Sequence, residues 1–478
     1  MKSLDIKKWL NLIFITSFSL VFCVPSHAIV SDILYKSVQQ DKLNHYQIKS
    51  NDIAPLIERI KKNSLFKVEQ IGQSFLGKPI HSITVGNGPT KVLFWSQMHG
   101  DEPTATPAIF DLLNYIAKET QAQWRKSWHE KLTLKFIPML NPDGADNYQR
   151  YNAQGIDINR DAKQQQTPEG KILLSMAKIF QPDFGFNLHD QRRNYAAGDN
   201  KKPATISVLA PSYNKTKEVN EVRGTAMKLI GDLVPVIEHF IPGHIGKYDD
   251  GFSERAFGDT FTALGTSTVL VESGGYYSDD NRQMPRRVNF EIMIAAINNI
   301  SNKQYLKQSL DAYNAIPMNN EGGIQDVVIR NLTVNAEHSY QIDLSFIMNI
   351  YGNKKAKINE IGDLSSLVGY FEFDASNCQY AEGKAFKLST EKPLLLSDTL
   401  YFRLLKRGYT HFVGDKSALK ITTQYPVVIN PSSVSTNRPK LNTSATFLLK
   451  DKSGIKLVVL DGQIYDLRTN KLLNKAGT

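Results

Sequence analysis

A buried strand and a helix are predicted one after the other in residues 92–119, VLFWSQMHGDEPTATPAIFDLLNYIAKE. Residues 92–96 are nearly all apolar, as expected for a strand covered on both faces. Residues 105–119 repeat apolar side chains three and four positions apart, which is typical of an amphipathic helix. The turn between them carries His99 and Glu102. In open α/β sheets such turns line the ligand crevice, so this turn is a candidate site.

The same alternation of apolar runs and helical patterns extends from about Val68 to Asn299. Further strands are predicted at 132–139, 184–188, 206–210 and 268–271, and further helices at 168–180, 216–234 and 285–300. Strands that alternate with helices form a mostly parallel sheet with helices on its faces. We therefore predict an α/β fold, with a mostly parallel mixed sheet flanked by helices, over residues 68–309.

The C-terminal part of the chain has a different pattern. After about Leu310 it consists of short alternating stretches, such as 327–334, 445–449 and 456–459, separated by turn sequences like Asp451-Lys452-Ser453-Gly454. We predict a β-rich C-terminal region over residues 310–478, in which 319–323 and 431–433 are loops or linkers. No chemical motif is evident in this region, and its role stays open.

The N-terminus has the composition of an export signal. Three lysines at positions 2, 7 and 8 precede an apolar run at 10–24, and the small residues Ser26 and Ala28 follow it. This order predicts a signal peptide over residues 1–28, cleaved after Ala28, and a periplasmic or secreted protein. The alternative is a membrane anchor, but the run is shorter than the roughly 20 residues that a span requires. After cleavage, residues 29–67 form a lead-in segment, and no stable membrane span is expected.

Composition narrows the possible partners. The chain of 478 residues is 41% hydrophobic and 22% charged, as in ordinary globular proteins. Its formal charge of +10 comes from scattered lysines and arginines without an aromatic-interleaved basic run, so nucleic acid is not an expected partner. Removal of the signal peptide leaves Cys378 as the sole cysteine, so no internal disulfide is expected.

A third polar residue follows another predicted strand. His189 comes directly after the apolar run at 184–188. Zn²⁺ accepts imidazole nitrogen and carboxylate oxygen together, and two histidines with one glutamate leave a fourth position for water. We therefore predict one zinc ion per chain, held by His99, Glu102 and His189. For the first pair taken alone, the alternative is a polar turn with a carboxylate at a helix start.

Glu272 is the predicted general base. It follows the apolar run at 268–271 and precedes Ser273, Gly274 and Gly275. Water activated by a metal needs a base, and a carboxylate at a buried strand end is costly unless it is paired or functional.

Asn159 and Arg160 lie between the metal-ligand segments. An arginine fork binds a carboxylate bidentately and an adjacent Asn adds a hydrogen bond, so this pair suits the free C-terminus of a peptide. A turn-rich loop with structural ion pairs is the alternative.

Several motifs occur in the order that they have in a known family. They are His99-Gly100-Asp101-Glu102, Asn141-Pro142-Asp143-Gly144, Arg150, Asn159-Arg160, His189 and Glu272. Over residues 68–300 the chain therefore resembles the zinc carboxypeptidases, whose founding members are the pancreatic enzymes. The resemblance implies a zinc metallocarboxypeptidase, with peptides that carry a free C-terminal carboxylate as substrates.

The resemblance also implies roles for single residues. Arg150 would polarise the scissile carbonyl, Asn159 and Arg160 would hold the terminal carboxylate, and Glu272 would act as general base and then acid. Asp157 matches a position that orients the first metal-bound histidine. Tyr248 lies near the place of the family's mobile substrate-binding tyrosine, with Tyr276 or Tyr277 as alternatives.

Other functions remain open at this point. Export and a basic surface would suit hydrolysis of peptidoglycan stem peptides by a cell-wall carboxypeptidase or amidase. The aspartoacylase and succinylglutamate desuccinylase branch shares several motifs but usually has Phe-Pro after its Asn-Arg pair, where this chain has Asp161-Ala162. A non-catalytic peptide- or glycan-binding module would have lost a ligand or the base, and none is lost. Side-chain specificity is unresolved between an apolar floor at Phe257 and an acidic one at Asp259.

Overall fold

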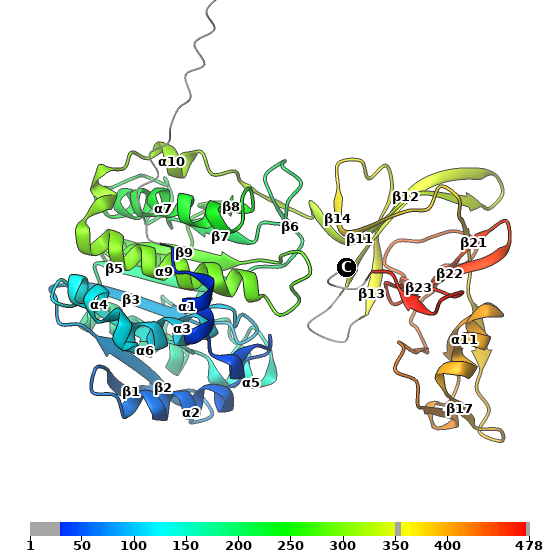
Figure 1. Cartoon of the computed structure of the whole chain (residues 1–478), viewed down its shortest axis with the longest axis horizontal. Helices are drawn as coiled ribbons and strands as arrows, with labels where there is room; N and C mark the ends of the chain where they lie inside the picture. The colour runs from blue at the N-terminus through cyan, green and yellow to red at the C-terminus, as the bar shows by residue number, and fades with distance from the viewer. Residues whose placement is uncertain (1–28, 349–354, 475–478) are drawn as a thin grey trace, which may run out of the picture.

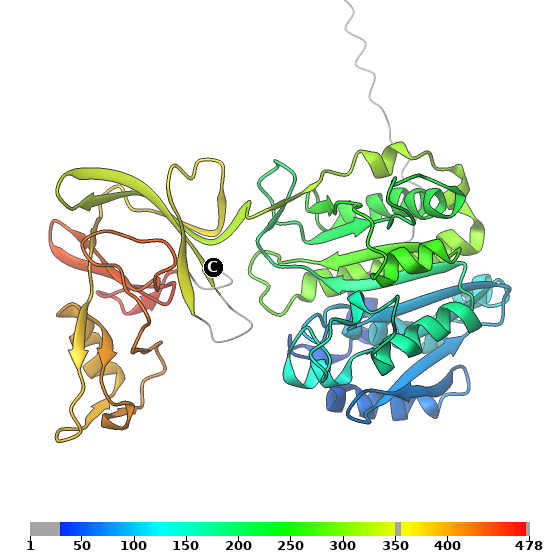
Figure 2. The same ribbon diagram turned by 180° about the vertical axis from the view of Figure 1, so that it is seen from behind.

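The computed structural model describes residues 29–348 and 355–474, so the predicted signal peptide at 1–28 lies outside the described residues. Two bodies lie side by side along the long axis of the molecule (Figures 1 and 2): an α/β body, coloured blue to green, and a β-rich body, coloured yellow to red. Among the described helices, none combines the length and apolarity required to cross a membrane.

A mixed sheet forms the centre of the α/β body, with strand order β1-β2-β4-β3-β5-β9-β7-β8. The strands in that order are β1 (Lys67–Gln73), β2 (Pro79–Val85), β4 (Leu132–Ile137), β3 (Thr90–Ser96), β5 (Phe184–Asp190), β9 (Ser267–Ser273), β7 (Ile206–Leu209) and β8 (Ile245–Lys247). The central strands β4, β3, β5 and β9 are parallel. Strands β1 and β2 run antiparallel to their neighbours, and β7 runs antiparallel to β9 but parallel to β8. The predicted α/β sheet is confirmed.

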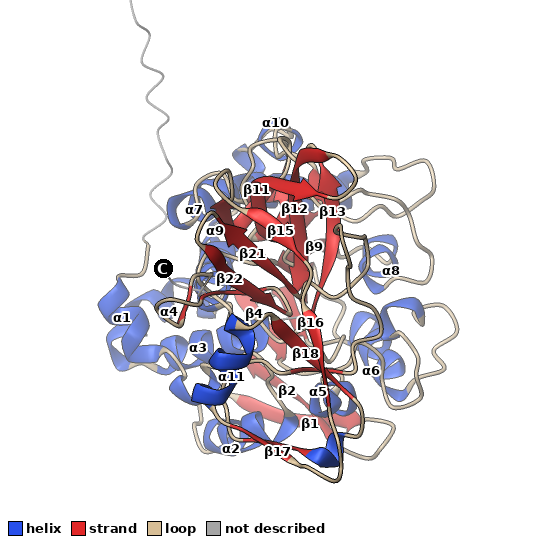
Figure 3. Cartoon of the chain, turned by 90° about the vertical axis from the view of Figure 1, so that its right-hand side faces the viewer, coloured by secondary structure: helices blue, strands red, loops and turns tan. Residues whose placement is uncertain are grey.

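Helices cover both faces of this sheet (Figure 3). They are α1 (Asp32–Val38), α2 (Ser50–Lys61), α3 (Ala105–Ala117), α4 (Ala122–His129), α5 (Pro142–Asn147), α6 (Pro168–Ile179), α7 (Glu221–Phe240), α8 (Phe257–Ala263), α9 (Gln283–Asn302) and α10 (Asp311–Asn314). Phe94 faces the core beneath α3, α7 and α9, and its neighbour Trp95 faces the core beneath α6 and α8. The near-continuous apolar runs of the sequence arise because successive side chains enter opposite cores.

Helix α7 differs from its predicted bounds of 216–234. It begins at Glu221 because the Asn220 side chain caps it, accepting a hydrogen bond of 2.9 Å from the Arg223 amide. It continues past Pro235 to Phe240, with Val236 and Ile237 buried in the core. Packing in the core outweighs the hydrogen bond that the proline removes, so the prediction of a helix end before Pro235 is wrong.

The lead-in residues 29–67 pack into the same core as the sheet. A buried ion pair holds them there: Arg286 donates hydrogen bonds of 2.8 Å to both carboxylate oxygens of Asp111. Arg286 also donates to the Gln40 carbonyl oxygen at 3.0 Å, and the Gln40 amide donates to Asp111 at 2.7 Å. Helices α3 and α9 are thus joined to the N-terminal segment through fully hydrogen-bonded charges.

Most strands of the β-rich body form one sheet in the order β13-β12-β11-β15-β21-β22-β23-β24, with β14 also paired to β11. The helix and strands of the whole β-rich body are β11 (Ile324–Asn335), β12 (Ser339–Met348), β13 (Ala356–Gly362), β14 (Val368–Asp374), β15 (Gln379–Ala381), β16 (Lys384–Lys387), β17 (Leu394–Leu396), α11 (Asp398–Lys406), β18 (Tyr409–Val413), β19 (Leu419–Ile421), β20 (Val428–Ile429), β21 (Phe447–Asp451), β22 (Gly454–Leu460), β23 (Gln463–Asp466) and β24 (Lys471–Leu472). The predicted turn at 451–454 joins β21 to β22 as a hairpin.

The predicted linker at 319–323 is partly a strand. Residues Asn319–Glu321 form β10, which pairs antiparallel with β6 (Tyr195–Ala197) of the α/β body. The prediction of a loop is wrong for these three residues because their partner strand is remote in sequence, and pairing between remote segments leaves no local pattern. The connection between the two bodies is therefore hydrogen-bonded to the α/β body.

Candidate active site

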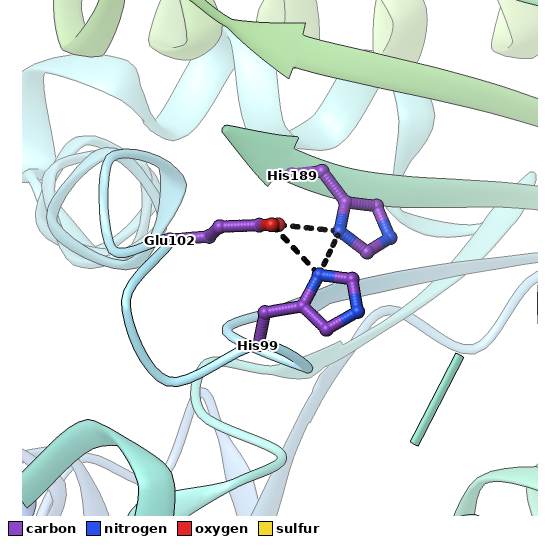
Figure 4. Close-up of side chains that lie close together, drawn as sticks. All are labelled: His99, Glu102 and His189. Atoms are coloured by element: carbon purple, nitrogen blue, oxygen red, sulfur yellow. Dashed lines mark hydrogen bonds and ion pairs between the residues drawn. The ribbon is translucent and has the colours of Figure 1, made fainter. Parts of the chain in front are cut away.

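Three side chains converge at the carboxyl ends of β3 and β5 (Figure 4). His99 and Glu102 lie in the turn after β3, and His189 lies near the end of β5. Nδ1 of His99 is 3.2 Å from Nδ1 of His189. The two Glu102 oxygens lie 2.8 Å from Nδ1 of His99 and 2.6 Å from Nδ1 of His189. They meet because β3 and β5 are adjacent and parallel and so end at the same edge of the sheet.

The donor set fits a zinc ion. His99, Glu102 and His189 are 2, 8 and 2% exposed, and their ligand atoms all lie within 4.8 Å of one another. Two Nδ1 atoms that face each other cannot both carry protons, and a buried carboxylate beside them requires a positive partner. A cation among the three accepts an electron pair from each, and imidazole with carboxylate is a ligand combination that zinc takes.

Asp157 contacts the far side of the His99 ring. Its Oδ1 lies 3.0 Å from Nε2 of His99 and accepts a 2.9 Å hydrogen bond from the Asn159 amide. Burial alone would raise the pKa of Asp157, but the bond to His99 and the charge of Arg150 hold that pKa well below its usual range. A carboxylate placed there fixes the orientation of the imidazole. Nε2 of His189, in contrast, is buried without a hydrogen-bond partner among the described residues.

Arg150 points toward the same centre. Its Nε donates to Oδ2 of Asp157 at 3.0 Å, and its Nη1 donates to Oε1 of Glu102 at 3.0 Å. The same Nη1 lies 3.1 Å from Nδ1 of His99. The Arg150 side chain is 36% exposed, so its guanidinium contacts both the buried ligands and the solvent. A cation in this position can stabilise negative charge that develops on a substrate oxygen beside the metal.

Glu272 lies next to His189 across the sheet. It pairs in register with His189 of β5 and with Ser207 of β7, so the three side chains leave the same face of the sheet. Burial, followed by the charges of Glu102 and Asp190, raises the pKa of Glu272 well above its ordinary value. A metal ion among the neighbouring ligands would lower this pKa, because an opposite charge favours the ionised form.

Asn159 and Arg160 lie in a short 3-10 helix, Ile158–Arg160, beside the metal ligands. The Asn159 side-chain oxygen accepts a 2.9 Å hydrogen bond from the Phe257 amide at the start of α8. Arg160 is exposed and donates to the Asn159 carbonyl oxygen at 2.7 Å. In the described part of the chain no carboxylate lies within ion-pair distance of Arg160, which leaves its charge available to a ligand.

The two candidate specificity residues lie in α8 but have different environments. Phe257 is fully buried in the core with Phe261 and does not reach a surface. Asp259 accepts a 2.9 Å hydrogen bond from the Ser253 amide, and burial raises its pKa to about 6. Phe257 is therefore a core residue, and Asp259 fixes the loop that precedes α8.

Tyr248 follows β8 and lies close enough to Glu272 for the charge of that carboxylate to affect its hydroxyl. Its ring is 5.7 Å from that of Tyr195, with which it shares a hydrogen bond. Burial, then the charge of Glu272, then Tyr195 raises the pKa of Tyr248. Tyr277, an alternative for the same role, instead packs against Tyr370 of the β-rich body, with ring centroids 5.8 Å apart.

Asp190 is a buried carboxylate beside the ligands that the sequence motifs did not single out. Asp190 accepts hydrogen bonds from the Thr104 hydroxyl at 2.6 Å and the Tyr46 hydroxyl at 3.2 Å, and lies 3.5 Å from Arg282. Burial raises the pKa of Asp190 to about 6. Its place directly after His189 was a usable signal, whereas nothing in the sequence connects it to Tyr46, 144 residues away.

A family model described as zinc carboxypeptidase matches residues 56–228. Residues 56–228 are thus similar to the zinc carboxypeptidase family. The matched residues include His99, Glu102 and His189. They end before Glu272, whose position beside these ligands is given by the pairing of β5 with β9.

Individual relatives match parts of this chain. Carboxypeptidase SOL1 from Arabidopsis thaliana is 30% identical over 188 residues, which are 32% of this chain and 37% of the plant protein. Gamma-D-glutamyl-L-diamino acid endopeptidase 1 from Lysinibacillus sphaericus is 34% identical over 82 residues, 16% of this chain and 21% of that protein. The chain thus covers less than two fifths of the length of either relative.

A metallo-carboxypeptidase from Burkholderia cenocepacia aligns with a TM-score of 0.43 and 16% sequence identity, over 54% of this chain and 71% of that protein.

Proposed function

We propose that the protein is a zinc-dependent metallocarboxypeptidase that hydrolyses the C-terminal peptide bond of peptides. The observation that carries this proposal is the convergence of His99, Glu102 and His189, with Glu272 beside them on the neighbouring strand. Bound zinc would supply a lowered pKa for a coordinated water and Lewis-acid polarisation of the scissile carbonyl.

Residues of the chain would transfer the proton and stabilise the charge that develops on the substrate. Glu272 accepts a proton from the attacking water and delivers it to the departing amine, which a carboxylate with a raised pKa can do near neutral pH. Arg150, whose Nη1 already faces the ligand set, stabilises the negative charge on the carbonyl oxygen. Asp157 keeps both His99 and Arg150 in place through its two oxygens.

Arg160 is the proposed anchor for the terminal carboxylate. Its exposed guanidinium has the fork geometry for a bidentate contact. Asn159 adds an amide to the same turn, and Tyr248, which follows β8, is close enough to Glu272 for the Glu272 charge to raise its pKa. A site with a fixed cation for the free C-terminus releases single residues from peptide ends and does not cut within a chain.

Matched peptides test this function. The full-length protein is incubated with one peptide as the free acid and as the C-terminal amide, with and without chelator, and products are identified by mass spectrometry. We expect chelator-sensitive release of single residues from the free acid, and a higher KM for Arg160→Ala. Equal hydrolysis of the amide, or internal cleavage, would overturn the proposal of a carboxypeptidase.

A cell-wall peptide is the second candidate substrate. The similarity to the Lysinibacillus sphaericus enzyme favours it, together with the signal peptide proposed at 1–28, which would place the protein in the periplasm or outside the cell. Stem peptides that contain D-amino acids, offered beside ordinary peptides, decide between the two substrates. A larger kcat/KM for stem peptides would assign the protein to cell-wall hydrolysis.

A further inference from the structure

The β-rich body contacts two loops that begin at the candidate active site. One loop, residues 191–194, follows β5, which carries His189, and the other, residues 274–282, follows β9, which carries Glu272. In Figure 1, β14 and β11 of the β-rich body lie beside β6, where the two bodies meet. The contacts described below all lie in this junction.

Tyr370 of β14 is held against both loops. Its hydroxyl donates a 2.8 Å hydrogen bond to the carbonyl oxygen of Arg193. The Arg193 guanidinium lies over the Tyr370 ring at 4.0 Å from the centroid, and the Tyr277 ring meets it edge-on at 5.8 Å. One aromatic side chain of the β-rich body thus touches the loop after β5 and the loop after β9 together.

Gly275 allows this close approach. A Cβ at this position would lie 2.3 Å from the Tyr370 hydroxyl oxygen and 2.8 Å from Cβ of Arg193. Any larger residue three positions after Glu272 would displace Tyr370 or the loop itself. The backbone next to the proposed base is therefore packed directly against the β-rich body.

A buried ion pair makes a second connection. Arg193 Nε lies 3.0 Å from Oδ1 of Asp326 in β11, a residue that is 7% exposed. Arg193 Nη1 lies 3.5 Å from Asp280 in the loop after β9. One guanidinium therefore joins a strand of the β-rich body to both loops.

Asn319 of β10 makes a third connection, closer to the base. Its amide nitrogen donates to the Gln191 side-chain oxygen at 3.0 Å, and its side-chain oxygen accepts from the Ser207 hydroxyl at 2.8 Å. Ser207 pairs in register with Glu272, and the Gln191 amide donates to the Ser273 carbonyl oxygen at 2.9 Å. These contacts reach the immediate neighbours of His189 and Glu272.

We propose that the β-rich body is a positioning element of the active site, in which Tyr370 and Asp326 act through Arg193 to hold the loops that follow His189 and Glu272. Its kinetic consequence rests on the proposed carboxypeptidase function. A displacement of about 1 Å in reacting groups can cost about 100-fold in rate, so fixing these loops affects turnover more than substrate affinity.

Kinetics of full-length variants test the proposal. Tyr370→Ala removes the hydroxyl and the ring, and Tyr370→Phe retains the ring. The matched control is Tyr401→Phe, which loses a 2.7 Å hydrogen bond to the Pro426 carbonyl oxygen inside the β-rich body. We expect kcat to fall about tenfold in Tyr370→Ala with KM within about twofold, and about threefold in Tyr370→Phe, at unchanged zinc content. Tyr401→Phe keeps the wild-type kcat.

Hydrogen exchange gives a readout that does not depend on activity. We expect faster amide exchange in residues 191–194 and 274–282 of Tyr370→Ala than in the wild type or Tyr401→Phe. If Tyr370→Ala does not fold, kcat and amide exchange are both measured on the double variant Tyr370→Phe, Asp326→Asn. Unchanged exchange in both loops together with unchanged kcat would overturn the positioning role. A wild type without peptidase activity would refute the proposed function, while exchange would still decide on the loop contacts.

Discussion

The two bodies bury polar side chains in different ways. In the α/β body, His99, Glu102, His189 and Asp190 are buried together at the carboxyl ends of neighbouring strands. Within the described residues 324–348 and 355–474, the β-rich body has no cluster of histidines and carboxylates with metal-binding spacing. Across residues 29–348 and 355–474, His99, Glu102 and His189 are the one cluster of three or more histidines, cysteines or carboxylates with metal-binding spacing. Clustered buried charge is costly, so its location indicates where the chemistry takes place.

Strand topology explains the difference. Parallel strands end at the same edge, so β3, β5 and β9 deliver polar residues to one place. In the β-rich body, β21 to β24 are antiparallel neighbours, so consecutive turns lie at opposite ends of the strands. The β-rich body also has parallel pairs, such as β11 with β14, but among the described residues none of them brings together a cluster with metal-binding spacing. The β-rich body therefore contributes contacts such as those of Tyr370, and the α/β body holds the proposed reacting groups.

The largest difference between the bodies is expected for removal of the base. Glu272→Gln keeps the shape of the side chain but cannot accept a proton, so kcat should fall by about 10²–10⁴-fold. The control in the β-rich body is Glu382→Gln at an exposed position, for which kcat stays at the wild-type value. Peptide hydrolysis and zinc content are measured for both. Retained turnover in zinc-loaded Glu272→Gln would contradict the assignment of the base.

A buried ion pair in the α/β body should matter more for stability than an exposed one in the β-rich body. Arg286→Met leaves Asp111 buried without its partner and should cost about 3–5 kcal/mol in the free energy of unfolding. Arg468→Met removes a 3.8 Å contact to Asp466 by a side chain that is 61% exposed, and should cost about 0–1 kcal/mol. Denaturant titration of both variants measures this. Equal losses would contradict the contrast.

Loss of the carboxylate that orients the proposed ligand His99 should have a smaller effect. Asp157→Asn replaces the carboxylate 3.0 Å from Nε2 of His99 and should weaken zinc affinity by about 10–100-fold. Asp363→Asn, at an exposed position in the β-rich body, should leave the affinity unchanged. Competition with a fluorescent zinc chelator gives both dissociation constants. Equal affinities in the wild type and Asp157→Asn would show that His99 does not need this partner.

The pH dependence is the smallest effect. The pKa of Glu272 is raised, so its proton is retained to higher pH than in an ordinary carboxyl, and the base is lost as pH falls through that raised value. In the zinc-loaded enzyme, where the metal lowers this pKa, kcat/KM should fall about tenfold per pH unit once the pH drops below the Glu272 pKa. Asp451, at the end of β21 in the β-rich body, differs because the hydrogen bond from Ser453 lowers its pKa. Zinc content is measured at each pH. The raised value belongs to the metal-free protein, so an isotope-edited infrared titration of the metal-free protein that finds Glu272 in the ordinary glutamate range, near pH 4.5, would contradict this environment.

Local pattern predicted the α/β sheet and the residues at its edge. Each of His99, His189 and Glu272 follows an apolar run, and the end of such a run is visible in the sequence. Strand order was not needed to place them together, since parallel strands share an edge. The structure brings His99, Glu102, His189, Asp157 and Arg150 into contact, and places Glu272 on the next strand.

Features that depend on remote residues could not be predicted. The helix through Pro235 is held by core packing, and β10 exists because β6 lies opposite it. The contact between Arg193 and Tyr370 joins residues 177 positions apart. No local signal encodes such pairs, so the sequence did not indicate a role for the β-rich body.

Zinc titration tests whether His99, Glu102 and His189 form a catalytic zinc site. The metal-free protein receives zinc in steps, and bound zinc and release of C-terminal residues are measured in the same samples. We expect activity to rise linearly and to reach its plateau at one zinc per chain. We expect His189→Ala to bind no zinc in this range. Full activity of the metal-free protein, or no zinc bound after reconstitution, would contradict a catalytic zinc site at His99, Glu102 and His189.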